Sequence, residues 1–328
     1  MNHIIAVRYG MEKAHDVNEA WFASIDVHKS YPFNISTSRK LLSKLGGLNQ
    51  ILGFLHSLFI PNAKLYLLTS TGCSCAVILK KIFLKSKIIA INSDTFFTDL
   101  ENAKGIKRFY MSWLLKHIDA IISTSEMMKN LSEKHTKVPN KVVYPFCEAE
   151  RFTKVNPKHT QNICSIGIGT NTKGTDILLD AFRDINKKIP NAKLIVCGNK
   201  DSLKGMNIPD NCIFPGIVDP APHLENSGLY INASRHESFG VNILEAMNAG
   251  IPAIVSNRCG AAELIEQIDS SLIVEPSAKE IAKKSIALLK NPEQRIVLGK
   301  KSRKIAKKYS KTKSVASFKK IFTELNKK

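Results

Sequence analysis

Residues 236–250 read HESFGVNILEAMNAG. One glutamate, Glu237, stands directly before a Ser-Phe-Gly turn, and a second, Glu245, follows eight positions later. The apolar spacing after this turn predicts a helix that begins near Gly240 or Val241. A helix in a protein core has no need of two carboxylates in this register. We therefore expect this stretch to hold a polar ligand.

The start of this helix favours an anion. Its first N–H groups and its dipole would make a seat for a phosphate, and Gly240 would let the ligand approach the backbone closely. Glu245 stands about five residues into the helix, roughly 7 Å along its axis. Carboxylates accept strong hydrogen bonds from vicinal hydroxyls, so the two glutamates could grip a sugar joined through a diphosphate to a ribose. A solvated helix face is the alternative explanation for Glu245.

Strands and helices alternate on both sides of this stretch, which is typical of parallel sheets covered by helices. The alternation restarts after the polar residues 147–161. We therefore expect two doubly wound α/β domains that face a cleft, with the ligand at the carboxyl ends of the strands. The expected strands are residues 3–7, 64–69, 87–91, 119–124 and 141–146 in the first domain, and 162–167, 192–198, 212–216, 229–234 and 252–257 in the second.

Composition narrows the class of protein. The chain has 328 residues, of which 44% are hydrophobic, enough for two cores. Its seven cysteines lack a framework spacing and indicate thiols in a reducing cytoplasm. The N-terminus has no secretory signal pattern, and the longest uncharged stretch, residues 65–79, is too short and too polar to span a bilayer. We therefore expect a cytoplasmic protein that is not integral to the membrane.

The net charge of +20 is unevenly distributed. Residues 1–147 carry 19 Lys and Arg against 10 Asp and Glu, and residues 279–328 carry 17 against 3, whereas residues 148–278 are mildly acidic. Basic ends of this kind could meet an anionic membrane, a nucleic acid or a phosphorylated acceptor, and a lysine-rich solvated surface is the plainer alternative. Nucleic acid is disfavoured, because no nucleic-acid-binding motif is present and aromatic residues do not interleave with the basic ones.

The run SRHESFGVNILEAMNAGIPAIVSNRCGAAELI (234–265) resembles the signature of the retaining, nucleotide-sugar-dependent glycosyltransferases of family 4, which have the GT-B fold. Two glutamates eight residues apart are common by chance, but Glu-Ser-Phe-Gly-x4-Glu-Ala-Met-x2-Gly-x-Pro is specific. Residues 165–182 resemble the glycine loop and lysine-bearing helix of this family, and residues 213–219 resemble its base-binding strand and turn. The resemblance covers residues 144–267 well and the N-terminal half loosely.

The resemblance implies a GT-B fold of two Rossmann-like domains. The expected boundaries are an N-terminal acceptor domain of residues 1–147, a C-terminal donor domain of residues 148–308, and a terminal helix of residues 309–328 that crosses back to pack on the N-terminal domain. The two basic segments could then form one region that docks on anionic lipid, at the inner face of the cytoplasmic membrane.

The resemblance also implies the reaction. A sugar would move from a UDP-, GDP- or ADP-sugar to a hydroxyl of a carbohydrate, lipid-linked or protein acceptor, with retention of anomeric configuration, in the synthesis of cell envelope, glycolipid or glycan. We expect no cofactor beyond the nucleotide sugar. The chain has no Asp-x-Asp sequence, so we also expect no metal.

Individual residues acquire roles from the same resemblance. Glu237 would hold the hydroxyls of the donor sugar, Glu245 would hold those of the ribose, and Lys173 would neutralise the departing phosphate. The expected catalytic residues are Glu237, Lys173 and Asp94. The expected donor-binding residues are Gly167, Gly169, Thr170, Val218, Ser238, Phe239, Gly240, Val241 and Glu245.

Two positions depart from the pattern of the family. Ile168 stands where the family commonly has an arginine, after the glycine that matches Gly167. Ser93-Asp94 stands where many relatives read His-Asp, so the role of that histidine falls to Asp94, to Ser93 or to neither. These departures fit either an altered donor or acceptor, or a catalytically impaired paralogue that binds a nucleotide sugar or scaffolds a partner. A nucleotide-sugar epimerase also has two such domains, but residues 236–247 do not suggest one.

Overall fold

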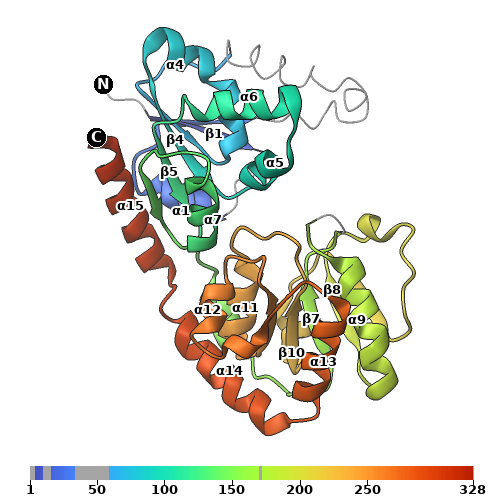
Figure 1. The fold of residues 1–328 in the computed structure, drawn as a ribbon. Helices are drawn as coiled ribbons and strands as arrows, with labels where there is room; N and C mark the ends of the chain where they lie inside the picture. The colour runs from blue at the N-terminus through green and yellow to red at the C-terminus, as the bar shows by residue number, and fades with distance from the viewer. Residues whose placement is uncertain (1–3, 10–15, 34–58, 170–171, 328) are drawn as a thin grey trace. The chain divides into compact units, whose positions relative to one another are not determined.

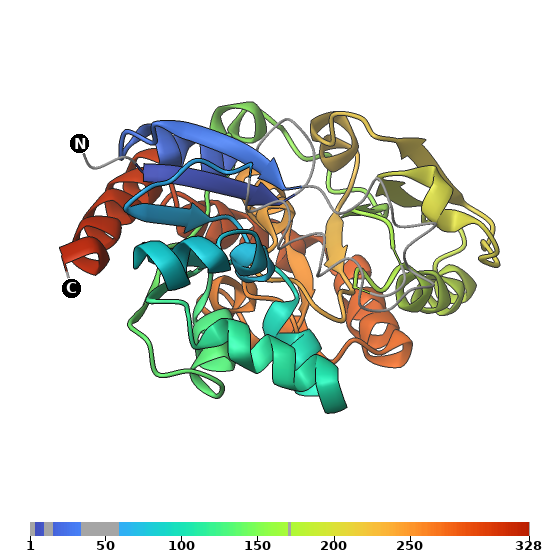
Figure 2. The same ribbon diagram turned by 90° about the horizontal axis from the view of Figure 1, so that it is seen from above.

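The computed structural model describes residues 4–9, 16–33, 59–169 and 172–327. The chain divides into two compact units (Figure 1). Unit 1 comprises Met1–Tyr144 and Ser314–Lys328, and unit 2 comprises Pro145–Lys313. Each unit is built on a six-stranded parallel sheet with helices packed on it (Figures 1 and 2). The prediction of two doubly wound α/β folds is therefore confirmed.

The sheet of unit 1 has the strand order β2-β1-β3-β4-β5-β6. Its inner strands are almost entirely buried, as the apolar run LYLL of β3 predicts for a parallel sheet with both faces covered. The elements of this unit are β1 (Ile4–Tyr9), α1 (Asp16–Ala23), β2 (Lys29–Phe33), β3 (Leu65–Leu68), η3 (Thr71–Ala76), α4 (Ile78–Leu84), β4 (Lys87–Asn92), α5 (Phe96–Asn102), α6 (Gly105–Leu115), β5 (Ala120–Ser123), α7 (Glu126–Glu133) and β6 (Asn140–Val142), followed at the end of the chain by α15 (Lys311–Lys327).

Helix α15 packs on α1 within unit 1. The ring of Phe318 stacks on Trp21 with centroids 4.9 Å apart, and Trp21 Nε1 donates a hydrogen bond of 3.0 Å to Ser314 Oγ. Phe318, Phe322 and Leu325 are buried, so the apolar face of this amphipathic helix is covered. The last segment of the chain therefore belongs to the fold of the first unit.

The sheet of unit 2 has the strand order β12-β11-β10-β7-β8-β9. The chain begins at the centre with β7 and reverses direction between β7 and β10, which creates a topological switch point. The elements are α8 (Ala149–Thr153), β7 (Ile163–Ile166), α9 (Thr175–Lys188), β8 (Leu194–Cys197), η4 (Lys200–Leu203), β9 (Cys212–Gly216), α10 (Ala221–Glu225), β10 (Leu229–Asn232), α11 (Val241–Ala249), β11 (Ala253–Ser256), α12 (Ala262–Glu266), η5 (Ser270–Leu272), β12 (Ile273–Val274), α13 (Ala278–Leu289) and α14 (Pro292–Ala306).

Three strands differ from the sequence prediction. Strand β2 was not among the expected strands; it contains Pro32 and lies at the sheet edge, where a missing N–H is tolerated. Strand β12 has two residues, too few for a recognisable pattern. The strand expected over residues 141–146 ends at Val142, so its apolar continuation lies beyond the sheet.

Candidate functional site

Most of the predicted site residues of unit 2 lie in the loops at the carboxyl ends of β7 and β10, two neighbouring strands. One loop follows β7 and leads into α9, and the other follows β10 and leads into α11. Both helices begin directly after a glycine in the left-handed conformation, Gly174 with φ 63° and Gly240 with φ 95°. The two helix N-termini thus open at the switch point of the sheet, where doubly wound folds bind ligands.

Lys173 and Glu237 form an ion pair that joins the two loops. The side chain of Glu237 is 14% exposed and that of Lys173 is 32% exposed. The backbone of Glu237 is held on both sides, since its N–H donates to the carbonyl of Arg258 at 3.0 Å and its carbonyl accepts from Gly260 N at 2.9 Å. The carboxylate is therefore held in place and neutralised. Sequence reasoning selected both residues but did not predict that they pair.

A second set of contacts ties the same loops together. The Arg235 guanidinium donates to both carboxylate oxygens of Asp176, at 2.8 and 2.6 Å, and these bonds lower the pKa of that carboxyl. Arg235 N donates to the carbonyl of Thr172 at 2.7 Å. A Cβ on Gly174 would lie 2.1 Å from the carbonyl oxygen of Ala233, so the chains meet where only glycine fits. Arg235 and Asp176 were missed, although their place beside the predicted lysine and glutamate was a usable signal.

The turn before α11 is equally constrained. A Cβ on Gly240 would lie 2.9 Å from Ile243 Cδ1 and 3.1 Å from Cys259 Sγ. The carbonyl of Phe239, a buried residue, accepts from Cys259 Sγ at 3.0 Å. The helix begins at Val241, as predicted. Ser238 and Val241 are half-buried at the same turn.

The glycine loop after β7 lies beneath the lysine side chain. A Cβ on Gly167, where φ is 101°, would lie 3.4 Å from Lys173 Cε, and one on Gly169 would lie 3.7 Å from Lys173 Cγ. Ile168 packs against Gly198, since a Cβ there would lie 2.9 Å from Ile168 Cγ1. Thr170 lies outside the described residues.

Glu245 lies on α11, where burial raises the pKa of its carboxyl from 4.5 to about 7. The Arg151 guanidinium lowers this pKa and the Asp219 carboxylate raises it. These two residues form an ion pair with each other, and Arg151 comes from α8 whereas Asp219 follows β9. Val218, the residue predicted for the base pocket, precedes Asp219 in the chain and is 43% exposed. The side chains around Glu245 therefore form a polar group on one side of the candidate site.

Asp94 belongs to unit 1, at the carboxyl end of β4. Its carboxylate accepts hydrogen bonds from Ser70 Oγ, from Phe96 N at 3.1 Å and from Gly72 N at 3.4 Å. Burial raises its pKa, while these bonds lower it. Ser93 Oγ donates to the carbonyl of Thr69 at 3.0 Å. Asp94 therefore links the ends of two neighbouring strands, and sequence reasoning did not identify Ser70 or Gly72 as its partners.

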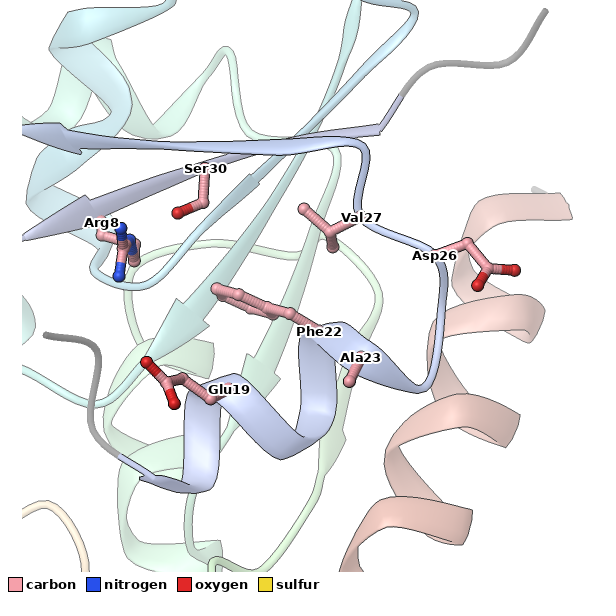
Figure 3. A pocket seen from close by; sticks show the side chains of 7 residues that line it. All are labelled: Arg8, Glu19, Phe22, Ala23, Asp26, Val27 and Ser30. Carbon is pink, nitrogen blue, oxygen red and sulfur yellow. The ribbon is translucent and has the colours of Figure 1, made fainter.

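Unit 1 also has a pocket of about 380 Å³ between α1 and the edge of the sheet (Figure 3). Arg8 of β1 and Glu19 of α1 lie on different walls of it (Figure 3). None of the predicted site residues lines this pocket. Its lining residues are Arg8, Glu19, Phe22, Ala23, Asp26, Val27 and Ser30.

Two further properties concern the described part of the chain alone. Within it, no three His, Cys, Asp or Glu side chains are grouped so that they could hold a metal ion. None of the helices described there has both the length and the apolar character needed to cross a membrane.

Most of the second unit matches a known family profile. Residues 147–305 match the family profile described as Glycosyl transferases group 1. An uncharacterized glycosyltransferase of Methanocaldococcus jannaschii is 25% identical over 267 residues, which cover 78% of this chain and 73% of that protein. The alpha-monoglucosyldiacylglycerol synthase of Streptococcus pneumoniae is 26% identical over 173 residues, covering 45% of this chain and 39% of that enzyme.

A solved structure supports the fold of both units. The crystal structure of Anabaena Alr3699/HepE in complex with UDP-glucose has a TM-score of 0.74 and 14% sequence identity, and the match covers 98% of this chain and 99% of that one. At this identity the likeness shows the fold alone. The predicted resemblance to glycosyltransferases of the GT-B fold is confirmed by the family match and this structure together.

Proposed function

We propose that this chain, whose residues 147–305 belong to the group 1 glycosyl transferases, is a retaining glycosyltransferase of family 4. It would transfer a sugar from a nucleotide-sugar donor to an acceptor hydroxyl. The observation that carries this proposal is the Lys173–Glu237 ion pair, which lies between two glycine-bounded helix starts at the switch point of the sheet.

The polar groups of the site match the parts of such a donor in order. The N-terminus of α11, opened by Gly240, would receive the diphosphate together with Lys173. Glu237 would hold the hydroxyls of the donor sugar, and Glu245 those of the ribose. The base would lie near Val218. The remaining donor-binding residues are Gly167, Gly169, Thr170, Ser238, Phe239 and Val241.

In the proposed reaction the bond between the sugar carbon and the diphosphate oxygen breaks, and a bond from the acceptor oxygen forms on the same face of the sugar. The proton of the acceptor hydroxyl passes to the departing diphosphate. No protein nucleophile is required, because Lys173 and the helix N–H groups stabilise the negative charge that develops on the leaving group. Asp94 would act on the acceptor side of the reaction. Neither step in this scheme uses a metal ion.

Two similar proteins indicate which substrates to consider for this chain. The Anabaena structure contains UDP-glucose, and the Streptococcus pneumoniae relative is named as a glycolipid synthase. We therefore propose a UDP-sugar as the donor and a lipid-linked acceptor, with the enzyme working in the cytoplasm at the inner face of the membrane. GDP- and ADP-sugars, and carbohydrate or protein acceptors, are the alternatives.

The test measures release of nucleoside diphosphate from UDP-, GDP- and ADP-sugars with a panel of acceptors. We expect turnover with one donor class, unchanged in excess chelator, and a product with the anomeric configuration of the donor. Inversion of that configuration would overturn the retaining mechanism, and activity restored only by a divalent ion would overturn metal independence. Donor binding without turnover would favour the alternative of a catalytically impaired paralogue, which the substitution at Ile168 motivates.

Two variants separate the roles of the glutamates. Glu237→Gln should mainly lower kcat, because it acts as the sugar bond breaks, whereas Glu245→Ala should mainly raise the donor KM. One lost hydrogen bond to a charged group is worth about 1.5–3 kcal/mol, so each parameter should change roughly 10- to 150-fold. Glu266→Gln, at an exposed position on α12, is the matched control and should leave both parameters unchanged. Wild-type kinetics for Glu237→Gln would show that the site is assigned wrongly.

A further inference from the structure

Large apolar side chains are exposed on two helices of unit 1. At the end of α4 the residue Phe83 is 77% exposed, and on α6 Ile106 and Phe109 are 88% and 75% exposed. Ile82 and Leu84 flank Phe83 with 45% and 48% exposure, and Phe59, shortly before β3, is 78% exposed. Together these residues form the α4–α6 surface: Phe59, Ile82, Phe83, Leu84, Ile106 and Phe109.

These residues are not the core-facing side of their helices. Ile78 of α4 and Met111 and Leu114 of α6 are buried in the same hydrophobic cluster under the sheet. Each helix therefore has one apolar side that packs in the core and further apolar side chains that face outward. A single exposed apolar residue is ordinary, but several on neighbouring elements indicate a contact surface.

The parts of the α4–α6 surface are close to one another. Helix α4 connects β3 to β4 and α6 connects β4 to β5, so right-handed crossovers place both on one face of the sheet (Figure 1). Lys81 of α4 forms an ion pair with Asp119, shortly after α6. Lys80 Nζ donates to Asn62 Oδ1 at 2.8 Å, which brings the segment that follows Phe59 against α4.

The segments that carry these apolar side chains are basic, although Lys81 pairs with Asp119 and Lys87 donates to the carbonyls of Leu325 and Asn326 on α15. Residues 78–90 contain four lysines and residues 104–117 contain three lysines and an arginine, without any Asp or Glu in either segment. Lys107 and Arg108 are exposed and lie between Ile106 and Phe109. Exposed large apolar side chains with cations beside them match the interface of a bilayer that contains anionic lipid.

The other strongly basic segment lacks this combination. The net charge of the last fifty residues is high, but Phe318, Phe322 and Leu325 of α15 are buried against unit 1. Helix α15 therefore has exposed lysines but no exposed large apolar side chains. It could be attracted to an anionic bilayer, but it has no apolar group that would insert into the headgroup region. This distinguishes the α4–α6 surface from the basic C-terminal segment that charge alone suggests.

We propose that the α4–α6 surface docks on an anionic lipid bilayer. Phe83, Ile106 and Phe109 enter the headgroup region, and the neighbouring lysines and Arg108 contact anionic lipids. Docking rests on unit 1 alone and does not depend on the proposed transfer reaction. Where that reaction also holds, docking keeps the enzyme at the surface that contains a lipid-linked acceptor.

The test compares co-sedimentation of the full chain with vesicles of phosphatidylcholine alone and of phosphatidylcholine mixed with phosphatidylglycerol. The wild-type protein should sediment with the mixed vesicles only, and high salt should weaken this binding. The double variant Phe83→Ser/Phe109→Ser and the double variant Lys107→Gln/Arg108→Gln should each bind roughly tenfold or more weakly. The matched control is Lys319→Gln/Lys320→Gln on α15, which removes two exposed charges and should retain binding.

Several results would overturn the proposal: equal binding to both kinds of vesicle, no binding to either, or undiminished binding of the Phe83→Ser/Phe109→Ser variant. Loss of binding in the α15 control alone would assign the contact to the C-terminal segment instead. A wild-type dimer in sedimentation velocity that the phenylalanine variant converts to a monomer, without vesicle binding, would assign the surface to a second copy of the chain. Nucleotide release with a soluble acceptor should be unchanged in the phenylalanine variant, so failure of docking and failure of the proposed reaction are distinguishable. Thermal melts check that each variant is folded.

Discussion

Replacing Glu245 with glutamine should stabilise the protein at alkaline pH and weaken nucleotide binding. Burial raises the pKa of this carboxyl from 4.5 to about 7. The folded state therefore favours the neutral form, and the stability that this form contributes is complete below pH 4.5 and is lost as the pH rises through about 7. The difference between the pKa of 4.5 and that of about 7 corresponds to a change of about 3 kcal/mol in the free energy of unfolding. This value is an upper bound, because the side chain is not fully buried.

Glutamine has nearly the same shape as glutamate and does not ionise, so the Glu245→Gln variant does not lose this stability as the pH rises. At about pH 8 its free energy of unfolding should exceed that of the wild type by roughly 2–3 kcal/mol, which corresponds to a rise in Tm of roughly 4–12 °C for a unit of this size. At about pH 4, where the carboxyl is protonated in both states, the two proteins should melt together. Thermal melts across this range measure the difference, with Glu266→Gln as the control that should show no dependence of the difference on pH.

Nucleotide binding should change in the opposite direction. If the Glu245 carboxylate accepts hydrogen bonds from ribose hydroxyls, binding requires the ionised form and releases a proton when the pH is below about 7. The affinity of the wild type for a nucleoside diphosphate should then rise with pH by up to about tenfold per unit in that range. The diphosphate titrates identically with both proteins, so the ratio of the two Kd values isolates Glu245.

Calorimetric titrations in two buffers with different ionisation enthalpies measure both the affinity and the proton release. Equal pH slopes of Kd in the two proteins would refute the placement of the ribose at Glu245. A difference in Tm that stays constant with pH would refute the raised pKa itself. The two results are independent, so the stability part of the reasoning can survive failure of the binding part.

Two other substitutions test the contacts that join the loops. Arg235→Ala and Asp176→Ala should each lower kcat roughly tenfold by releasing the Lys173 loop. The double variant should be no worse than either single one, because each substitution removes the same ion pair, and additive losses would contradict a shared role. Arg183→Ala, which removes an exposed ion pair elsewhere on α9, is the control. Gly174→Ala should destabilise the fold by roughly 2–4 kcal/mol in denaturant melts, since its Cβ would lie 2.1 Å from the carbonyl oxygen of Ala233. Gly205, with φ 81°, has open space around it, so Gly205→Ala should cost only roughly 1–2 kcal/mol of backbone strain. Equal costs of the two substitutions would show that the contact between Gly174 and Ala233 is not rigid.

Much of the architecture could be predicted because it depends on local pattern. Apolar runs located the inner strands of both sheets, and the Phe-Gly turn located the start of α11 at Val241. The strands that were missed are an edge strand with a proline and a strand of two residues, where the local pattern is weak. The predicted roles of the site residues stay predictions, because position alone does not establish them.

The pairing of side chains could not be predicted in the same way. Lys173 and Glu237 are far apart in the chain, and which of several polar residues at neighbouring strand ends meet depends on loop geometry. The partnership of Asp94 with Ser70 has the same character. The exposure of Ile106 and Phe109 on α6 was likewise not predicted.

The Lys173–Glu237 pair also bears on how a donor would enter the site. Glu237 is only 14% exposed, and an unpaired carboxylate in such surroundings would lose solvation that the lysine now replaces. A diphosphate that binds Lys173 would therefore weaken the Lys173–Glu237 ion pair. The hydroxyls of the donor sugar would then have to donate hydrogen bonds to Glu237 in place of the lysine. A nucleoside diphosphate without the sugar supplies only the first half of this exchange. In the proposed reaction the same ion pair would give the site a physical reason to distinguish the intact nucleotide sugar from its product, because only the substrate would satisfy both the lysine and the glutamate.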